Sequence, residues 1–258
     1  MASSLTATAS SLSRTTATAL LSKVQRGLSP LELVYVPHDN WLPQRPRISI
    51  LDASFNPPTI AHLALATTPA STAADARLFL LSVRNADKVL KPGDATHLQR
   101  LDMMLLLARR HRAAVALIDE PTFAGKARVL CTAFPGASVT FLLGFDTLER
   151  VLAPRYYGGE ALMAAALDTF FSPAQDNARI VCARRGAVSP ESQTLARAER
   201  FVADGRIELV DIGEAEQTYS STAVRDAIAR GDDSWKQLVT PDIAEYIMGE
   251  KLYVAVNE

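Results

Sequence analysis

Short apolar runs alternate with helical patterns along most of this chain, and this alternation restricts the fold more than any other feature of the sequence. Each run is long enough for only a single strand. Strands that are apolar on both faces are typical of a parallel sheet covered by helices on each side. We therefore predict an α/β fold, a Rossmann-like doubly wound parallel sheet with helices on both faces. The predicted strands span Arg47–Ala53, Arg77–Val83, Ala113–Ile118, Ala137–Gly144, Arg179–Ala183 and Ile207–Ile212.

The segments between these runs carry apolar residues at helical spacing. The clearest case is Ala95–Arg112, in which Leu98, Leu101 and Leu105 form one apolar stripe. In doubly wound folds, ligands bind at the carboxyl ends of the strands, so functional residues are expected in the loops that follow strands. The predicted helices span Ile60–Thr67, Ala95–Arg112, Gly125–Ala133, Asp146–Leu152, Glu160–Phe171, Glu191–Ala203, Ala223–Arg230 and Asp242–Met248.

The segment Ala53–His62 lies between the first predicted strand and the first predicted helix and reads Ala-Ser-Phe-Asn-Pro-Pro-Thr-Ile-Ala-His. A strand, a tight turn and a helix start in so few residues direct backbone N–H groups and a positive helix end at one point, which suits a phosphate. Thr59 is a good N-cap, which makes His62 the third helical residue. The alternative is an ordinary strand–loop–helix turn with a surface histidine.

A second segment, Tyr219–Arg225, reads Tyr-Ser-Ser-Thr-Ala-Val-Arg. Ser221 or Thr222 is expected to cap a helix whose N-terminus can receive an anion. Arg225 follows about one turn later, where its forked guanidinium can bind phosphate oxygens. The alternative is a plain capped helix with a surface arginine.

Together the two segments resemble the signatures of the nucleotidyltransferase superfamily. The first is similar to the T/HxGH signature, in the form GSFNP-x-T-x-x-H that is typical of nicotinamide mononucleotide adenylyltransferases. The second resembles ISSTxxR, with Tyr219 in place of the usual Ile. The chain departs from the first signature at Ala53 and Ala61, which stand where the family has glycine. The resemblance extends from Arg47 to Tyr253. Within the family, the chain looks most like a divergent fungal-type branch.

This resemblance implies adenylyl transfer from ATP to nicotinamide mononucleotide, giving NAD and pyrophosphate by direct in-line attack. His62, Arg225 and Lys88 are the implied catalytic residues, with His62 bonded to the α- or β-phosphate as charge develops. Mg²⁺ is expected to arrive with ATP and to bridge phosphate oxygens with mostly water ligands, so no residue is assigned to the metal. The residues implied to bind the ATP phosphates are Ser54, Phe55, Asn56, Thr59, His62, Ser221, Thr222 and Arg225.

Gly144-Phe145-Asp146 follows a predicted strand and resembles the family's G-x-D element. There the glycine lets the backbone approach the nucleotide, and the carboxylate of Asp146 is expected to accept a hydrogen bond from a ribose hydroxyl or to contact the metal region. The alternative is that Asp146 only caps the helix that begins there.

Aromatic residues are expected to stack on the nicotinamide ring, because the family binds this cation in that way. Phe123 and either Tyr156 or Tyr157 fall close to the positions that carry these aromatics in the family. The alternative is core packing for Phe123 and an exposed helix end for the two tyrosines.

Two further segments resemble the family without a clear chemical role. Arg100 lies where the adenylyltransferases have a His-Arg helix start, and both a ligand role and a structural role stay open. The segment from Leu238 to Tyr253 is similar to the family's C-terminal helix and indicates relatedness but no chemistry.

Composition narrows the class of partner. The net charge of −1 argues against a protein that coats nucleic acid, and no apolar run reaches the roughly 18 residues needed to span a bilayer. Cys131 and Cys182 are far apart, so zinc binding and a disulfide framework are both unexpected. The partners that the family resemblance implies are the small molecules ATP and nicotinamide mononucleotide, while the oligomeric state stays open.

Residues 1–44 are predicted to form a partly disordered N-terminal leader, and residues 45–258 the nucleotidyltransferase domain. Residues 1–31 contain no acidic residue and three basic ones, Arg14, Lys23 and Arg26. Two interpretations fit this composition: a mitochondrial transit peptide, or a leader that ends in a short helix near Thr18–Arg26. We expect a cytoplasmic or nuclear location, with the mitochondrion as the alternative.

Two rival functions remain open at this level. One is another nucleotidyltransferase that uses a different phosphate-bearing acceptor. The other is a nucleotide-binding protein or weak ATPase that has lost transfer activity, which Ala53 and Ala61 would explain.

Overall fold

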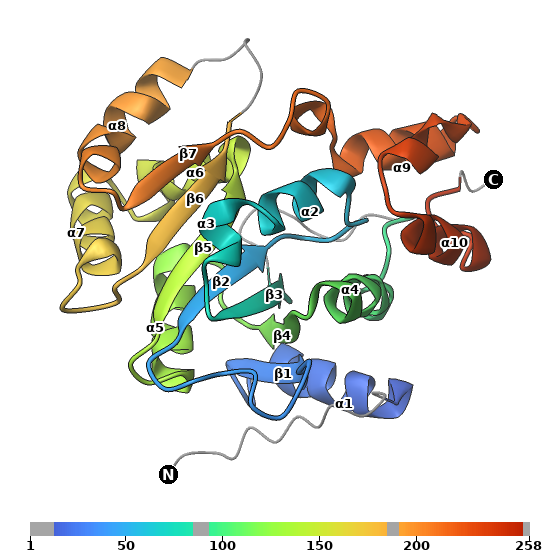
Figure 1. The fold of residues 1–258 in the computed structure, drawn as a ribbon, viewed down its shortest axis with the longest axis horizontal. Helices are drawn as coiled ribbons and strands as arrows, with labels where there is room; N and C mark the ends of the chain where they lie inside the picture. Colours follow the sequence, from blue (N-terminus) through green and yellow to red (C-terminus); the bar gives the residue numbers. More distant parts are fainter. Residues whose placement is uncertain (1–12, 85–92, 185–190, 255–258) are drawn as a thin grey trace.

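The structure, a computed structural model, describes residues 13–84, 93–184 and 191–254 (Figure 1). Within these residues the core is a seven-stranded sheet with the order β1-β4-β3-β2-β5-β6-β7. Strands β2 to β7 run parallel, and β1 pairs antiparallel with β4. The strands are β1 Leu31–Tyr35, β2 Arg47–Asp52, β3 Ala76–Ser82, β4 Ala114–Ile118, β5 Ser138–Gly144, β6 Arg179–Ala183 and β7 Ile207–Val210.

Helices cover both faces of this sheet, so the predicted α/β architecture is confirmed (Figure 1). One core cluster forms between the sheet and α5, α6, α7 and α8, and a second forms between the opposite face and α1, α2, α4, α9 and α10. The α-helices are α1 Arg14–Gln25, α2 Ile60–Ala66, α3 Pro69–Thr72, α4 His97–His111, α5 Phe123–Ala133, α6 Phe145–Val151, α7 Glu160–Phe171, α8 Glu191–Ala203, α9 Ser221–Ala229 and α10 Pro241–Gly249. Short 3₁₀ helices span Pro154–Tyr156, Glu216–Thr218 and Asp233–Gln237.

The central strands explain why their sequences read as continuous apolar runs. In β2, Ile48 and Ile50 pack into the first core cluster, whereas Leu51 packs into the second. All three side chains are buried. Because successive strand residues point to opposite faces, a strand covered on both sides is apolar at most positions, and the buried Ser49 of β2 accepts a hydrogen bond from the Ser71 hydroxyl.

The strand order creates a topological switch point at the carboxyl edge of the sheet. The chain runs outward from β2 to β3 and β4, returns to β5 on the other side of β2, and then continues to β6 and β7. In doubly wound sheets this reversal of direction, between β2 and β5, is where ligands bind. The first signature follows β2 directly and Gly144 ends β5, so both lie at this switch point.

The N-terminal part contributes more to the fold than the sequence indicated. The helix predicted near Thr18–Arg26 is present as α1, but the strand β1 was not predicted. Leu31 of β1 pairs with Ile118 of β4, so β1 is an edge strand of the main sheet, on the leader side of the predicted boundary at residue 44. Buried Glu32 forms an ion pair with Lys23 of α1, and this pairing explains how a charged residue fits within a buried strand.

Smaller differences concern element ends. The helix expected from Ala95 begins at His97, because Thr96 is its N-cap and accepts a hydrogen bond from the Gln99 N–H. Likewise α5 begins at Phe123 and not at Gly125, with Thr122 as its N-cap. In the part of the chain that the structure describes, no helix combines the length and the apolar character needed to cross a membrane.

Candidate active site

The two signature segments meet at the switch point, although they are far apart in the sequence. The Ser221 hydroxyl, at the start of α9, donates a hydrogen bond of 2.7 Å to the backbone carbonyl of Pro57. One N–H group of Arg225 donates to the backbone carbonyl of Asn56 over 2.6 Å. The turn after β2 and the start of α9 are therefore in direct contact, which is the arrangement that two segments would need in order to bind the same phosphates.

His62 occupies the position predicted for it, the third residue of α2 after the N-cap Thr59. Its Nδ1 accepts a hydrogen bond of 3.0 Å from the Thr59 backbone N–H and lies 2.8 Å from the Thr59 hydroxyl oxygen. Because Nδ1 accepts, the ring proton of neutral His62 is carried by Nε2. Burial lowers the pKa of His62 to about 4, so the ring is neutral near pH 7 and offers an N–H donor.

Phe55 and Asn56 serve the framework of the turn through their side chains. Phe55 is fully buried with a φ of 46°, and its ring packs against His62 at a centroid distance of 5.7 Å. This burial leaves only the backbone of Phe55 for a ligand.

The Asn56 side chain is engaged within the protein. Its oxygen accepts hydrogen bonds from the Ala95 backbone N–H and from the Tyr253 hydroxyl, at 3.2 Å and 3.0 Å. Its Nδ2 donates to Asp94 over 2.7 Å. The prediction that Asn56 binds phosphate is therefore corrected for its side chain. This residue is only 5% exposed, and its amide oxygen and nitrogen are both engaged in hydrogen bonds within the protein.

The N-cap of α9 is a different residue from the one predicted. Ser220, and not Ser221 or Thr222, is the N-cap, because its backbone is extended and its hydroxyl accepts from the Ala223 N–H at 3.1 Å. Ser221 is thereby free to bond to Pro57, and the Thr222 hydroxyl accepts from Arg225 at 3.3 Å. Three successive hydroxyl residues are equivalent cap candidates in a sequence, so only the backbone conformation distinguishes them.

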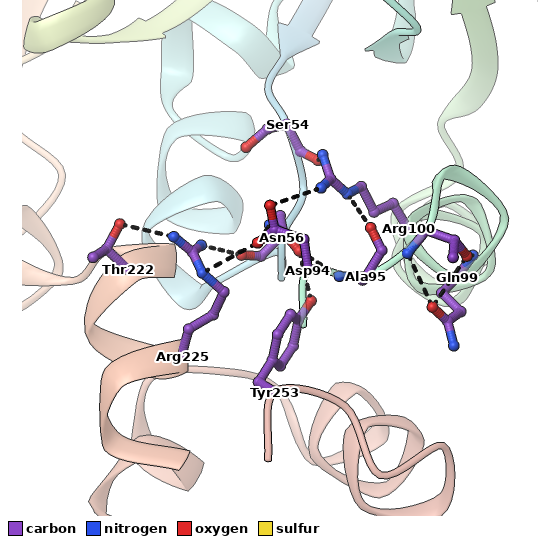
Figure 2. A network of polar contacts seen from close by, with 10 residues as sticks. Ser54, Asn56, Asp94, Ala95, Gln99, Arg100, Thr222, Arg225 and Tyr253 are labelled. Atoms are coloured by element: carbon purple, nitrogen blue, oxygen red, sulfur yellow. Dashed lines mark hydrogen bonds and ion pairs between the residues drawn. The ribbon is translucent and has the colours of Figure 1, made fainter. Parts of the chain in front are cut away.

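Asp94 joins two arginines at this site (Figure 2). Its carboxylate oxygens lie 3.7 Å from Nε of Arg225 and 3.9 Å from a terminal nitrogen of Arg100. The Arg100 side chain is only 9% exposed and also donates to the backbone carbonyl of Ala95 over 2.8 Å. Its burial and its contacts support the structural interpretation of Arg100 that the sequence left open.

Gly144 and Asp146 lie exposed at the carboxyl end of β5, next to β2. Gly144 is the N-cap of α6 and Asp146 is the second residue of that helix, so the alternative that Asp146 is the cap is wrong. A Cβ atom added to Gly144 would meet no atom within 4 Å. The backbone there faces open space that a ligand can enter, which agrees with the placement expected for a nucleotide.

The three aromatic candidates are placed differently from one another. Phe123 starts α5 and packs edge-on against Phe141 at 5.3 Å. Tyr157 donates its hydroxyl proton to the Val151 carbonyl over 2.8 Å, and burial raises the pKa of Tyr157 to about 12. Tyr156 lies beside the Arg155 guanidinium, 4.8 Å from the ring centroid. Tyr157 is therefore partly buried and bonded within the protein, which does not fit the exposed helix end given as its alternative, while stacking by Phe123 or Tyr156 stays a prediction.

Sequence reasoning missed a buried ion pair at the end of β2. The Asp52 carboxylate contacts Nζ of Lys126 on α5, and each side chain is only 5% exposed. Asp52 and Lys126 are 74 residues apart in the sequence, so the pair forms only when α5 packs against the end of β2. Asp94 and Tyr253 were missed for the same reason: each acquires its role only through contacts with distant segments.

Two predicted features cannot be placed in this site. Lys88 and its loop lie outside the described residues. For the metal, the described residues contain no group of three or more His, Cys, Asp or Glu side chains that could hold an ion.

Known proteins are similar to this chain over most of its length. No protein-family model matches the chain. The chain is 31% identical over 209 residues to a Schizosaccharomyces pombe (strain 972 / ATCC 24843) protein named "Putative nicotinamide mononucleotide adenylyltransferase", covering 75% of this chain and 80% of that protein. It is 28% identical over 215 residues to the "Probable nicotinate-nucleotide adenylyltransferase" of Gloeobacter violaceus (strain ATCC 29082 / PCC 7421), covering 80% of this chain and 96% of that protein.

A solved structure shares the fold. The structure of Plasmodium falciparum nicotinic acid mononucleotide adenylyltransferase complexed with APC matches with a TM-score of 0.56 and 16% identity, over 81% of this chain and 97% of that chain. With the relative that is 31% identical and covered over 80% of its length, these findings establish that the chain belongs to the nicotinamide and nicotinate mononucleotide adenylyltransferase family of the nucleotidyltransferase superfamily.

Proposed function

We propose that this protein transfers the adenylyl group of ATP to nicotinamide mononucleotide, forming NAD and pyrophosphate. The observation that carries the proposal is the joining of the two phosphate-binding segments at the switch point, through Ser221, Arg225 and the turn after β2. Family membership supports the reaction class, and the relative that is 31% identical, named for nicotinamide mononucleotide, supports this acceptor.

In the proposed reaction an oxygen of the mononucleotide 5′-phosphate attacks the α-phosphorus of ATP in line. The new bond joins that oxygen to the α-phosphorus, and the bond from the α-phosphorus to the bridging oxygen of the β-phosphate breaks. Pyrophosphate leaves with the electron pair. No covalent enzyme intermediate is required, so the protein acts by positioning the phosphates and by stabilising charge.

His62 is proposed to donate the hydrogen on Nε2 to an α- or β-phosphate oxygen as negative charge develops. Its neutral state supports this role, because Nδ1 is held by Thr59 and the proton is left on the opposite nitrogen. Within the described residues no hydrogen bond engages that second nitrogen. A donor fixed before the reaction stabilises the transition state without reorganisation.

Arg225 is proposed to bind the β- and γ-phosphates and the departing pyrophosphate, with Ser221 and Thr222 beside it. The side chain of Arg225 is 29% exposed, so part of its guanidinium is accessible to a ligand. The backbone amides of Ser54 and Phe55 are proposed to complete the phosphate site from the opposite segment. Gly144 and Asp146 are proposed to accommodate a nucleoside, because they are exposed at the adjoining strand end.

Mg²⁺ is proposed to enter on the phosphates of ATP and to supply charge neutralisation there. An ion held mainly by phosphate oxygens and water needs no cage of protein ligands. Removal of Mg²⁺ by a chelator is therefore expected to abolish transfer while leaving the fold intact.

The acceptor is tested by incubating the purified protein with ATP, Mg²⁺ and either nicotinamide or nicotinate mononucleotide. We expect dinucleotide and pyrophosphate in equal amounts, with a higher kcat/KM for the nicotinamide form. A higher kcat/KM for the nicotinate form would reassign the acceptor. ATP hydrolysis without any dinucleotide would contradict the proposal and support the rival of a weak ATPase.

A further inference from the structure

We infer that Tyr253, near the carboxyl end of the described chain, is a positioning residue that orients Arg225 through Asn56 and Asp94. This inference rests on the proposed function, since it concerns how Arg225 is presented to phosphate. The sequence pattern indicated no chemical role for the segment that contains Tyr253. Tyr253 also lies outside both signature segments.

Tyr253 reaches the centre of the site from outside the sheet (Figure 2). It follows α10 and adopts a φ of 64°, a backbone region that non-glycine residues seldom occupy. The residue is nevertheless only 7% exposed, because its ring belongs to the core cluster on the α9 and α10 side of the sheet. The chain therefore turns sharply after α10 and places this ring beneath the turn that follows β2.

The contact between Tyr253 and Asn56 has one possible direction. The Asn56 amide oxygen carries no hydrogen, so the phenol must donate across the 3.0 Å that separates the two oxygens. Burial raises the pKa of Tyr253, which keeps the donor proton in place. The second bond to the same oxygen comes from the Ala95 backbone N–H. The two donors together fix which end of the Asn56 amide faces Asp94.

With the amide fixed in this way, Asn56 directs Nδ2 at Asp94, and Asp94 in turn faces Arg225. The Asn56 to Asp94 bond is 2.7 Å, and the same carboxylate oxygen lies 3.7 Å from Nε of Arg225. The backbone carbonyl of Asn56 also accepts directly from Arg225 over 2.6 Å. One asparagine thus supports Arg225 in two ways, and Tyr253 is the side chain that orients its amide.

The freedom of a long arginine side chain explains why this support matters. Asp94 is placed against both Arg100 and Arg225. A long arginine side chain loses considerable freedom when it is held in a single geometry. A chain of oriented hydrogen bonds provides that geometry before ATP binds, which is the condition for efficient charge stabilisation.

The inference is tested with Tyr253→Phe, which removes the hydroxyl and keeps the ring. We expect kcat for dinucleotide formation to fall about fivefold to tenfold, the size of one lost hydrogen bond, while KM for the mononucleotide changes by less than about twofold. The matched control is Tyr246→Phe, because the Tyr246 hydroxyl also donates from the carboxyl-terminal region, to Asp102 over 2.9 Å. Tyr246→Phe should lose comparable thermal stability and keep the wild-type kcat.

A double-mutant cycle separates positioning from a general loss of stability. In an Arg225→Lys background, Tyr253→Phe is expected to change kcat by less than about twofold, because its effect is transmitted through the guanidinium. An equal decrease in both backgrounds, or a wild-type kcat in Tyr253→Phe, would overturn the inference while leaving the proposed function intact.

If the wild-type protein forms no dinucleotide, the proposed function fails and the inference is judged by ATP affinity. Calorimetric titration with ATP should then give a Kd several-fold higher for Tyr253→Phe than for wild type and Tyr246→Phe. Equal Kd values for all three proteins would overturn the positioning role as well.

Discussion

At the scale of single residues, the chemistry of the site depends on the protonation of His62. Two hydrogen-bonding groups of Thr59 face Nδ1, and burial disfavours the imidazolium, so the neutral ring with a proton on Nε2 is the form present near pH 7. A neutral donor can stabilise developing charge on phosphate without giving up its proton. This distinguishes the proposed role of His62 from that of a general acid.

The lowered pKa of His62 also predicts how stability depends on pH. Between the ordinary pKa of 6.5 and about 4, the unfolded chain takes up a proton at this position and the folded protein does not. The contribution of neutral His62 to stability is therefore complete above about pH 6.5 and decreases as pH falls through this window. Replacing His62 by Gln should make the unfolding free energy less steeply dependent on pH between 4.5 and 6.5. Equal slopes for the two proteins in urea titrations would show that the pKa of His62 is not lowered in the folded protein.

Single residues also show where prediction from the sequence succeeded and where it could not. Thr59 and His62 were placed correctly because capping follows local rules that a sequence displays. Asn56 was assigned to phosphate because its neighbours suggested it, whereas its partners Asp94, Ala95 and Tyr253 come from distant segments. Contacts of that kind become visible only after the chain has folded.

At the scale of elements, the start of α9 is the clearest test of a corrected prediction. Ser220→Ala removes the cap of this helix and is expected to cost about 1 kcal/mol of unfolding free energy, measured by chemical denaturation. Thr222→Ala, in which the cap stays intact, is the matched control and should cost clearly less. A larger loss for Thr222→Ala would mean that Thr222 caps the helix after all.

The ion pair between β2 and α5 gives a second prediction at this scale. Lys126→Ala leaves the buried Asp52 carboxylate without its partner, so a loss of about 3–5 kcal/mol is expected. The exposed pair of Lys236 and Asp233 is the control, and Lys236→Ala should cost less than about 1 kcal/mol. Thermal and urea unfolding measure both values. Similar small losses for the two variants would show that Asp52 and Lys126 are solvated rather than buried together.

Elements differ in how well a sequence reveals them. The strands β2, β3, β4, β5 and β6 were predicted because each is a continuous apolar run, which the two covered faces of the sheet require. Strand β1 was missed because five residues that include a glutamate carry no clear pattern, and its stability comes from β4 and α1. Local pattern is therefore sufficient for central strands and insufficient for this edge strand.

At the scale of the whole molecule, the N-terminal elements complete the sheet. Strand β1 covers the outer edge of β4, and α1 packs Leu21 and Val24 into the core cluster that also contains α4. Deletion of residues 1–44 therefore uncovers both apolar surface and an unpaired strand edge, which promotes aggregation. We expect the truncated chain to unfold at a lower temperature and to aggregate in size-exclusion chromatography.

A shorter deletion that ends before α1 keeps both elements and serves as the control for this experiment. The opposite result is a chain that begins at residue 45, is monodisperse and unfolds at the wild-type temperature. In that case residues 31–35 would be dispensable for the fold, and the predicted boundary at residue 44 would be a true domain boundary. The parallel sheet with helices on both faces follows from the alternation of strands and helices that the sequence displays, whereas the strand order and the switch point between β2 and β5 come from the structure.

The central proposal for the whole molecule is one site in which two distant segments bind the phosphates of ATP. The most direct measurement is the steady-state rate of dinucleotide formation from ATP and nicotinamide mononucleotide by the wild-type protein and by His62→Ala. His38→Ala is the matched control, because His38 is exposed outside this site. The account predicts measurable NAD formation by wild type and by His38→Ala, and a kcat at least about a hundredfold lower for His62→Ala, the size expected when one fixed donor is lost. A His62→Ala protein that turns over at the wild-type rate would contradict it.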